Sequence, residues 1–267
     1  MEKYGADLFK DAASFYSRYR PMYPASLIRF LVKQFSLNGD QNLLDLGSGT
    51  GQLTVRFSDW CNKIVGIDIE PEMINEAKRL HQELRVGQIQ WFNGTLEQYK
   101  ELHNDQFTIV TIAKAFHWMD RPRVLEELFD LIPYGGGVAI IDNYDPDKSL
   151  EPWQVKLNEL IEKWYGKERR AGKSTYTHPI ISHEEVISNS KFEVEVHTLP
   201  TYEINWTIES ILGNLYSTSY GARRFLGNKI EEFEKEVKES LSEFSTTGEL
   251  RETVNVSVKL GRKKRHA

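Results

Sequence analysis

The chain has 267 residues, of which 40% are hydrophobic and 12% aromatic, and its formal net charge is −5 at pH 7. This length favours one domain with an insertion over two complete domains, and the apolar content is sufficient for a large core. The acidic balance argues against a general nucleic-acid-binding surface, because such a surface needs a basic face. No segment approaches the roughly 18 consecutive apolar residues of a membrane-spanning helix. The sequence therefore predicts neither nucleic acid nor a membrane as a partner.

Cysteine usage bears on the compartment. Cys61 is the only cysteine, which excludes a disulfide within the chain. So few cysteines fit a reducing environment, and residues 1–7 contain no apolar signal core. These observations predict a cytoplasmic protein.

The N-terminal segment is predicted to be helical. Apolar and aromatic residues recur at helical spacing from Phe9 to Tyr19, and Pro21 and Pro24 then interrupt the chain. We expect residues 1–37 to form a helical cap.

Between residues 41 and 145, apolar strands alternate with amphipathic helices. Pro71 and Pro122 mark the first turns of two of these helices. The predicted strands cover residues 42–46, 63–67, 89–92, 107–113 and 138–142. Strands of this kind form a parallel sheet with helices on both faces, so the sequence predicts an α/β fold with a doubly wound sheet.

Two more strands are predicted near the C-terminus, over residues 192–197 and 251–258, where apolar and polar residues alternate. The segment between them contains helix candidates at 207–217 and 229–244.

We expect this intervening segment, residues 201–247, to be a helical lid that folds over the site before the last strand. A structural or dimerising flap is the alternative. The core domain would then comprise residues 38–200 and 248–262.

Three glycines at alternate positions, Gly47, Gly49 and Gly51, follow the first predicted strand. A Cβ there would keep the backbone away from a ligand, and such turns use positive φ angles. The second predicted strand ends in an acid, Asp68. Doubly wound folds hold a nucleoside with this pair of features, because the acid accepts hydrogen bonds from the ribose hydroxyls.

The glycine spacing distinguishes between nucleoside cofactors. Dinucleotide enzymes use G-x-G-x-x-G, which places a pyrophosphate at a helix N-terminus. This chain has G-x-G-x-G preceded by Asp45, and that variant resembles the class I S-adenosylmethionine-dependent methyltransferases. The resemblance implies a seven-stranded, mostly parallel Rossmann-like sheet and S-adenosyl-L-methionine as cofactor, with S-adenosyl-L-homocysteine as product.

Further motifs narrow the resemblance. The aromatic and Arg-Pro pattern of residues 9–24 and the sequence AFHWMD of residues 115–120 look like small-molecule methyltransferases related to trans-aconitate methyltransferase, a methyltransferase type 11-like group. Residues 131–137 resemble the turn before the fifth strand of that group. The resemblance covers residues 9–145 well and the rest loosely.

Each part of the cofactor has candidate partners in the sequence. Asp68 suits the ribose diol, and the planar fork of Arg20 suits the methionine carboxylate. Tyr16, one helical turn earlier, either shares that contact or packs its helix. Asp45 either organises the loop or reaches the cofactor's amino group through water. The predicted cofactor-binding residues are Tyr16, Arg20, Asp45, Gly47, Ser48, Gly49, Gly51, Asp68, Ile69, Thr95, Leu96 and Ala113.

The adenine end is less well specified. Ile69 can pack on the ring, and Leu96 can supply a backbone donor. Many relatives have an acid near the position of Thr95, so a hydroxyl or backbone group is expected to serve here. Ala113 ends the fourth strand near the expected methionine tail, where the role of Lys114 is left open.

His117 is the candidate general base, because an ordinary histidine titrates near neutral pH. A structural or cofactor-covering role is the alternative, and a carboxylate acceptor would need no base. The spacing of His178, His183 and His197 shows no metal-ligand pattern, so no metal is predicted.

Aromatic residues from segments expected at the carboxyl edge of the sheet are candidates for an acceptor pocket, although each also suits a core position. The insertion adds an arginine that could hold an anionic acceptor. The predicted substrate residues are Tyr23, Phe116, Trp118, Tyr144, Tyr216 and Arg223.

The sequence thus favours a methyltransferase that moves a methyl group to an O, N or C atom of a small molecule by in-line displacement. A methyltransferase acting on a protein, tRNA or quinone is one alternative, and a non-catalytic cofactor-binding protein is another. Neither the acceptor nor the oligomeric state can be inferred from the residues.

Overall fold

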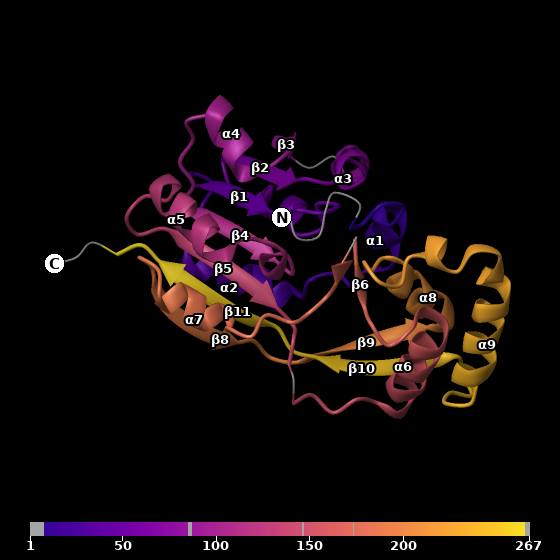
Figure 1. Cartoon of the computed structure of the whole chain (residues 1–267). Coiled ribbons are helices and arrows are strands. Elements are labelled where there is room, and N and C mark those ends of the chain that lie inside the picture. The colour runs from indigo at the N-terminus through magenta and orange to yellow at the C-terminus, as the bar shows by residue number, and fades with distance from the viewer. Residues whose placement is uncertain (1–7, 85–86, 146, 173, 265–267) are drawn as a thin grey trace.

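The computed structural model describes residues 8–84, 87–145, 147–172 and 174–264. Its centre is a seven-stranded sheet in the order β3-β2-β1-β4-β5-β11-β8 (Figure 1). The strands are β1 (Asn42–Leu46), β2 (Lys63–Asp68), β3 (Ile89–Asn93), β4 (Ile109–Ala113), β5 (Gly137–Asp142), β8 (Glu193–Thr198) and β11 (Ser257–Arg262).

The first five strands are parallel, whereas β11 is antiparallel to both β5 and β8. The strand order reverses between β1 and β4, which creates the crevice where ligands bind in doubly wound sheets. The predicted seven-stranded, mostly parallel α/β sheet is confirmed.

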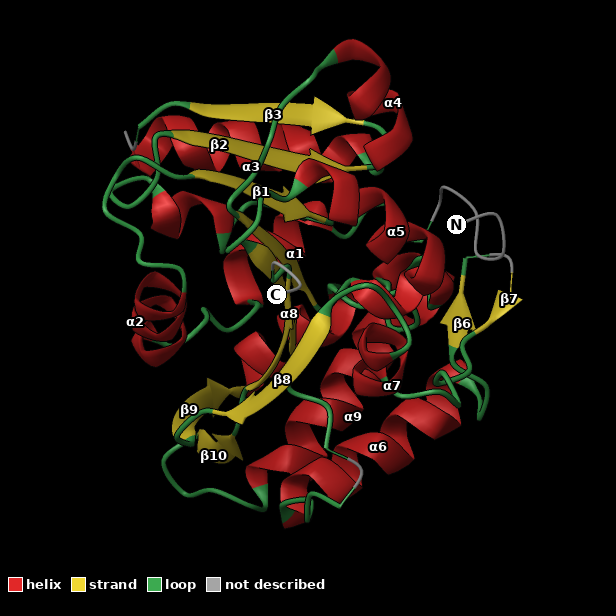
Figure 2. Ribbon diagram, turned by 90° about the vertical axis from the view of Figure 1, so that its left-hand side faces the viewer, coloured by secondary structure: helices red, strands yellow, loops and turns green. Residues whose placement is uncertain are grey.

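Helices cover both faces of the sheet, as Figure 2 shows. Residues of α4, α5 and α7 pack into one apolar cluster with the sheet, and residues of α2 pack into the other. The helices of this part are α2 (Ala25–Gln34), α3 (Pro71–Leu84), α4 (Leu96–Leu102), α5 (Arg121–Leu131) and α7 (His183–Ser188).

The single strand predicted over residues 251–258 is wrong, because the structure has two strands there. β10 (Glu249–Val254) pairs with β9 (Tyr202–Thr207) outside the main sheet, and β11 begins at Ser257. Together β8–β9 and β10–β11 form one long antiparallel ribbon that leaves the sheet (Figure 1).

A β-bulge bends this ribbon where it leaves the sheet. The N–H of Leu199 donates to the carbonyl of Val256 at 2.9 Å, and the next pair along the ribbon is Tyr202 with Val254. Two residues on one strand, 200 and 201, therefore lie opposite the single residue 255, and an extra residue of this kind bends and twists a ribbon.

The outer end of the ribbon carries a helical body with its own core. The body contains α8 (Ile208–Tyr216) and α9 (Ile230–Ser242), and α6 (Pro152–Tyr165) packs with them around Phe233 and Trp206. Because α6 comes from residues that the sequence assigned to the core domain, the helical body draws on two separate segments. The division into cap, core and lid itself remains a prediction. No helix in the described ranges is long and apolar enough to cross a membrane.

α1 (Ala13–Tyr19) connects the helical body to the sheet, since it packs against both α8 and α3. The contact with α8 is close: a Cβ on Gly213 would lie 2.2 Å from the ring of Tyr19. Only glycine at this position allows the two helices to approach so closely.

Replacing Gly213 with alanine is expected to push α1 away from α8 and to lower the free energy of unfolding by about 1–3 kcal/mol, the usual cost of overpacking. Urea unfolding followed by circular dichroism measures this. Lys238→Ala, at an exposed position of α9, is the matched control and should change stability by less than about 0.5 kcal/mol. Equal stability of the Gly213→Ala and control variants would contradict the proposed close packing.

Candidate functional site

A cleft opens at the carboxyl ends of β1, β2 and β4. It is lined by Leu8, Phe9, Tyr16, Leu46, Gly47, Gly49, Ile67, Asp68, Ile69, Glu70, Met73, Gly94, Thr95, Leu96, Glu97, Ala113, Lys114, Ala115, Trp118, Met119, Asp120, Arg123 and Val124. Nine of these are predicted site residues: Tyr16, Gly47, Gly49, Asp68, Ile69, Thr95, Leu96, Ala113 and Trp118.

The glycine loop adopts left-handed backbone geometry at all three glycines, with φ angles of 75° at Gly47, 54° at Gly49 and 77° at Gly51. A Cβ at Gly51 would lie 2.4 Å from the ring of Trp91, whereas Gly49 faces the ring of Tyr16 across the cleft. The absence of a side chain at Gly51 therefore allows the Trp91 ring to pack beneath the loop. Gly47 and Gly49 form part of the wall of the cleft.

Ser48 lies between the two wall glycines, and its N–H donates to the carbonyl of Ile67 at 3.0 Å. Its hydroxyl is buried without a hydrogen-bond partner among the described residues. The loop leads into a short 3-10 helix, Thr54–Phe57, rather than into a regular α-helix.

The Asp68 carboxylate joins the glycine loop to the end of β2. Its Oδ2 accepts the N–H of Gly49 at 2.8 Å, and its Oδ1 accepts the N–H of Glu70 at 2.9 Å. Burial raises the pKa of Asp68, and these N–H groups act against that shift by favouring the charged form. Each oxygen keeps a lone pair for a further donor.

Asp45 lies behind the loop, and its side chain does not reach the cleft. It is almost fully buried, at 1% exposure, and it accepts hydrogen bonds from Thr54 at 2.5 Å and Thr111 at 2.7 Å. Asp45 thus ties the segment after the loop to β4, which matches the loop-organising alternative. Burial raises its pKa to about 6.

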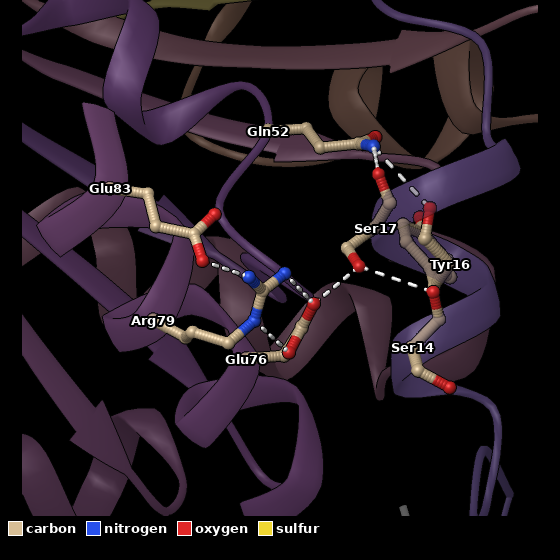
Figure 3. A network of polar contacts seen from close by, with 7 residues as sticks. All are labelled: Ser14, Tyr16, Ser17, Gln52, Glu76, Arg79 and Glu83. Atoms are coloured by element: carbon tan, nitrogen blue, oxygen red, sulfur yellow. Dashed lines mark hydrogen bonds and ion pairs between the residues drawn. The ribbon is translucent and has the colours of Figure 1, made fainter.

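α1 is fixed over the glycine loop by polar contacts, which Figure 3 shows. The Gln52 amide donates to the carbonyl of Tyr16 at 3.3 Å and to that of Ser17 at 3.0 Å. Ser17 also donates to Glu76 on α3, and Arg79 pairs with the same carboxylate. These contacts place the Tyr16 ring at the cleft.

Arg20 follows α1 and lies behind Tyr16, outside the lining of the cleft. Its guanidinium stacks on the Tyr16 ring at 4.9 Å, and its Nη2 donates to the carbonyl of Ser217 at 3.3 Å. Its Nε is buried without a hydrogen-bond partner among the described residues.

At the opposite end of the cleft, Thr95 caps α4. Its hydroxyl accepts the N–H of Gln98, and the Gln98 side chain accepts the N–H of Thr95 in return. This capping box engages the Thr95 hydroxyl, one of the two groups that the sequence offered for adenine, the other being a backbone group. Ile69 and Leu96 line the same cleft. Glu70, which the sequence analysis did not single out, also lines the cleft at 7% exposure, and its place two residues after Asp68 was the available signal.

His117 lies beside the cleft rather than in its wall. Its ring packs against Trp118 at 4.6 Å and Tyr176 at 5.7 Å. Burial lowers its pKa to about 4, so the imidazole is neutral at pH 7 and binds a proton less readily than an ordinary histidine does.

The fold brings His117 together with two residues distant in sequence, Asp142 at the end of β5 and His183 at the start of α7. One ligand-type atom from each lies within 4.8 Å of the others, a grouping that sequence spacing could not show. The Nε2 of His183 is 3.8 Å from the Asp142 carboxylate, and Arg121 Nη1 is 3.2 Å from His183 Nδ1. Because arginine can only donate, Nδ1 accepts, and the proton of neutral His183 resides on the Nε2 that faces Asp142. A nitrogen that carries a proton cannot bind a metal ion, so this tautomer disfavours metal ligation through Nε2 of His183.

The predicted acceptor residues are dispersed. Trp118 lines the cleft and Tyr23 lies near it, with its ring 5.8 Å from the Lys114 ammonium. Phe116 is buried in the core at 1% exposure, and Tyr144 is exposed and stacks on His178 at 4.0 Å.

Tyr216 and Arg223 belong to the helical body, where both contact Glu234 at 3.0 Å and 3.4 Å. The structure does not bring these two residues to the cleft. Both side chains contact Glu234 within the helical body, where Tyr216 is buried and Arg223 is exposed.

A glycine loop after β1, an acid at the tip of β2 and an antiparallel strand between β5 and β8 together define the class I methyltransferase architecture. Residues 43–136 match the family model described as a methyltransferase domain. This part of the chain is therefore a methyltransferase domain.

Relatives agree with this assignment. An uncharacterized methyltransferase of Schizosaccharomyces pombe is 29% identical over 161 residues, which cover 59% of this chain and 60% of that protein. The match thus spans only about three fifths of the relative's length.

Solved structures show the same fold. A putative type II methyltransferase from Anaeromyxobacter dehalogenans superposes with a TM-score of 0.67 at 20% identity. The superposition covers 93% of this chain and 100% of the Anaeromyxobacter chain. A methyltransferase from Geobacter sulfurreducens in complex with S-adenosyl-L-homocysteine gives a TM-score of 0.53 at 17% identity, covering 96% and 97% of the two chains.

The raised pKa of Asp45 makes stability depend on pH in a definite direction. The folded protein holds this proton up to about pH 6, whereas an unfolded aspartate loses it near pH 3.9. The contribution of Asp45 to stability therefore rises as pH falls from 7 toward 4, by about 2 kcal/mol between pH 7 and pH 4.5.

Asp45→Asn removes this titration while preserving the shape of the side chain. Urea unfolding of both proteins at pH 7 and pH 4.5 measures the difference. The stability of the wild type relative to the variant should increase by about 2 kcal/mol on acidification. An unchanged difference would show that Asp45 is ionised in the folded protein at both pH values.

Proposed function

We propose that this chain is an S-adenosyl-L-methionine-dependent methyltransferase that acts on a small-molecule acceptor. The observation that carries the proposal is the placement of the Gly47–Gly49 wall and the Asp68 carboxylate side by side in one cleft, joined by the bond from the Gly49 N–H to Asp68. The methyltransferase domain match and the S-adenosyl-L-homocysteine held by the Geobacter neighbour support it.

The residues present fit the cofactor. The free lone pairs of Asp68 suit the two hydroxyls of a ribose, and the unpartnered Nε of Arg20 suits a carboxylate. Ile69, Met73 and Leu96 offer an apolar surface for adenine between these polar groups and α4. The glycines at the wall let a ligand approach the backbone of the loop.

S-adenosyl-L-methionine supplies a methyl group on a sulfonium, which is already a good leaving group. The chain's own task is then to align the acceptor with that methyl group, and alignment of this kind is worth roughly 7–11 kcal/mol. His117 lies beside the cleft, adjacent to Trp118, and its lowered pKa makes it a weaker base than an ordinary histidine. The proposal therefore does not depend on a general base.

The cover of the cleft supports a small acceptor. Phe9 contacts Trp118 edge-to-face at 6.2 Å, and Trp118 in turn packs on Tyr176 at 5.1 Å. Tyr176 follows the hairpin of β6 (Arg170–Ala171) and β7 (Ser174–Thr175). The N-terminal segment and this hairpin thus meet over the site, which leaves little room for a macromolecular substrate. The helical body beyond them is proposed to act as a lid.

Calorimetric titration with S-adenosyl-L-homocysteine tests the cofactor assignment. The wild type should bind in the micromolar range, and Asp68→Ala should bind at least about tenfold more weakly, a difference of about 1.4 kcal/mol, because the ribose loses its acceptor. Asp130→Ala, an exposed aspartate of α5, is the matched control and should bind as the wild type does.

Two results would oppose the proposal. One is a folded wild-type protein that does not bind the product. The other is equal binding by Asp68→Ala and Asp130→Ala, which would mean that the acid at the tip of β2 does not hold the ligand.

A further inference from the structure

Lys114 is the first residue after β4 and lines the cleft. Its φ angle is 53°, a left-handed conformation that residues with a Cβ adopt only at an energetic cost. Strained residues of this kind concentrate at functional sites, where the surrounding structure holds them in place. The Lys114 ammonium lies 5.8 Å from the centre of the Tyr23 ring.

The Lys114 ammonium lacks a counter-ion in contact. Across the described parts of the chain, it forms no hydrogen bond and no ion pair within 4.0 Å. The nearby charges are those of Arg20, Asp142 and Glu252. Glu252 is already engaged by Lys148 at 2.7 Å and by the indole N–H of Trp206 at 2.9 Å.

Asp142 is likewise occupied elsewhere. Its Oδ1 accepts the backbone N–H groups of Asn143 and Tyr144 at 2.7 Å and 2.9 Å, and its Oδ2 faces His183. A partly buried ammonium without a paired anion is unfavourable, and burial lowers the pKa of Lys114 to about 8. At pH 7 the group is still largely protonated and available to an incoming anion.

The two cations that line the cleft differ in their pairing. Of the described lining residues, two are cationic, and Arg123 is paired with Glu127 at 3.0 Å and Glu97 at 3.3 Å. The acids Asp68, Glu70, Glu97 and Asp120 also line the cleft. Among the described lining residues, Lys114 is therefore the cation that has no paired anion.

We propose that Lys114, next to the ring of Tyr23, forms a subsite for a carboxylate, and that this carboxylate belongs to the methyl acceptor. The inference rests on the proposed function, because it needs an acceptor beside the cofactor. Two sources could supply the carboxylate, since the cofactor has one in its methionine tail. Arg20 is the better partner for the cofactor's own carboxylate. It stacks on Tyr16, which faces Gly49 of the loop, and its Nε is unpartnered among the described residues. Lys114 then remains for the acceptor.

The first arm of the test identifies which carboxylate Lys114 binds. Calorimetry compares S-adenosyl-L-homocysteine with 5′-methylthioadenosine, which lacks the amino-acid tail, on the wild type, Arg20→Met and Lys114→Met. Arg20→Met should reduce the preference for S-adenosyl-L-homocysteine about tenfold or more. Lys114→Met should leave both affinities within about threefold of the wild type. Selective loss of S-adenosyl-L-homocysteine binding in Lys114→Met would overturn the proposal, because the cofactor's own carboxylate would then occupy the subsite.

The second arm tests the acceptor side. Protein saturated with S-adenosyl-L-homocysteine is titrated with benzoate, phenylacetate, succinate and glutarate, and with the corresponding amides. At least one acid should bind about tenfold more tightly than its amide, and the preference should disappear in Lys114→Met and persist in Lys114→Arg, which keeps the charge. Lys78→Met, at an exposed lysine of α3, should keep the full preference.

The outcomes separate this inference from the proposed function. Failure of the wild type to bind S-adenosyl-L-homocysteine would refute the proposed function. Normal binding of S-adenosyl-L-homocysteine, with no acid preferred over its amide or with the preference retained in Lys114→Met, would refute the carboxylate subsite alone. Binding of S-adenosyl-L-homocysteine by Lys114→Met also shows that the variant is folded.

Discussion

The hydrogen bonds of the Asp68 carboxylate hold the site together. One oxygen accepts the N–H of Gly49 and the other accepts the N–H of Glu70, so a single side chain fixes the glycine loop relative to the end of β2. The left-handed backbone at Gly47 and Gly49 allows the loop to approach that carboxylate. The position of the remaining cleft residues follows from this junction, because β1, β2 and β4 all end at it.

The rest of the chain is arranged around this junction in two layers. Behind the loop, Asp45 ties the segment after the glycines to β4 through Thr54 and Thr111. In front of it, Gln52 holds the carbonyls of Tyr16 and Ser17 and so keeps α1 over the cleft. Since α1 also packs on α8, the helical body at the end of the bent ribbon is mechanically coupled to the loop.

This coupling offers a physical route from acceptor to cofactor. The helical body is joined to the cofactor cleft through α1 and through the ribbon. Both elements place a charge near Lys114: Arg20 follows α1, and Glu252 belongs to the ribbon. A negatively charged acceptor that reached this ammonium would find a cation without a paired anion among the described residues. We regard that cation as the group that would orient an acceptor in the cleft.

The sequence was most informative where a local pattern determines the structure. Alternating apolar strands and helices predicted the sheet, and the positions of Gly47, Gly49 and Asp68 predicted the cleft, because each depends only on nearby residues. Local patterns could not show that a bulge splits residues 249–262 into two strands, since the bulge arises from pairing with residues 199–202. They also could not show that His117, Asp142 and His183 converge, or that Tyr216 and Arg223 turn inward to Glu234, because those contacts form only when distant segments pack.

A crystal structure of the protein with S-adenosyl-L-homocysteine would show directly whether Asp68 binds the ribose. We expect the ribose hydroxyls to donate to the Asp68 carboxylate, the homocysteine carboxylate to lie at Arg20, and the Lys114 ammonium to remain free of the ligand. A ligand bound elsewhere, or one whose ribose lies away from Asp68, would contradict the assignment of Asp68 as the ribose-binding acid.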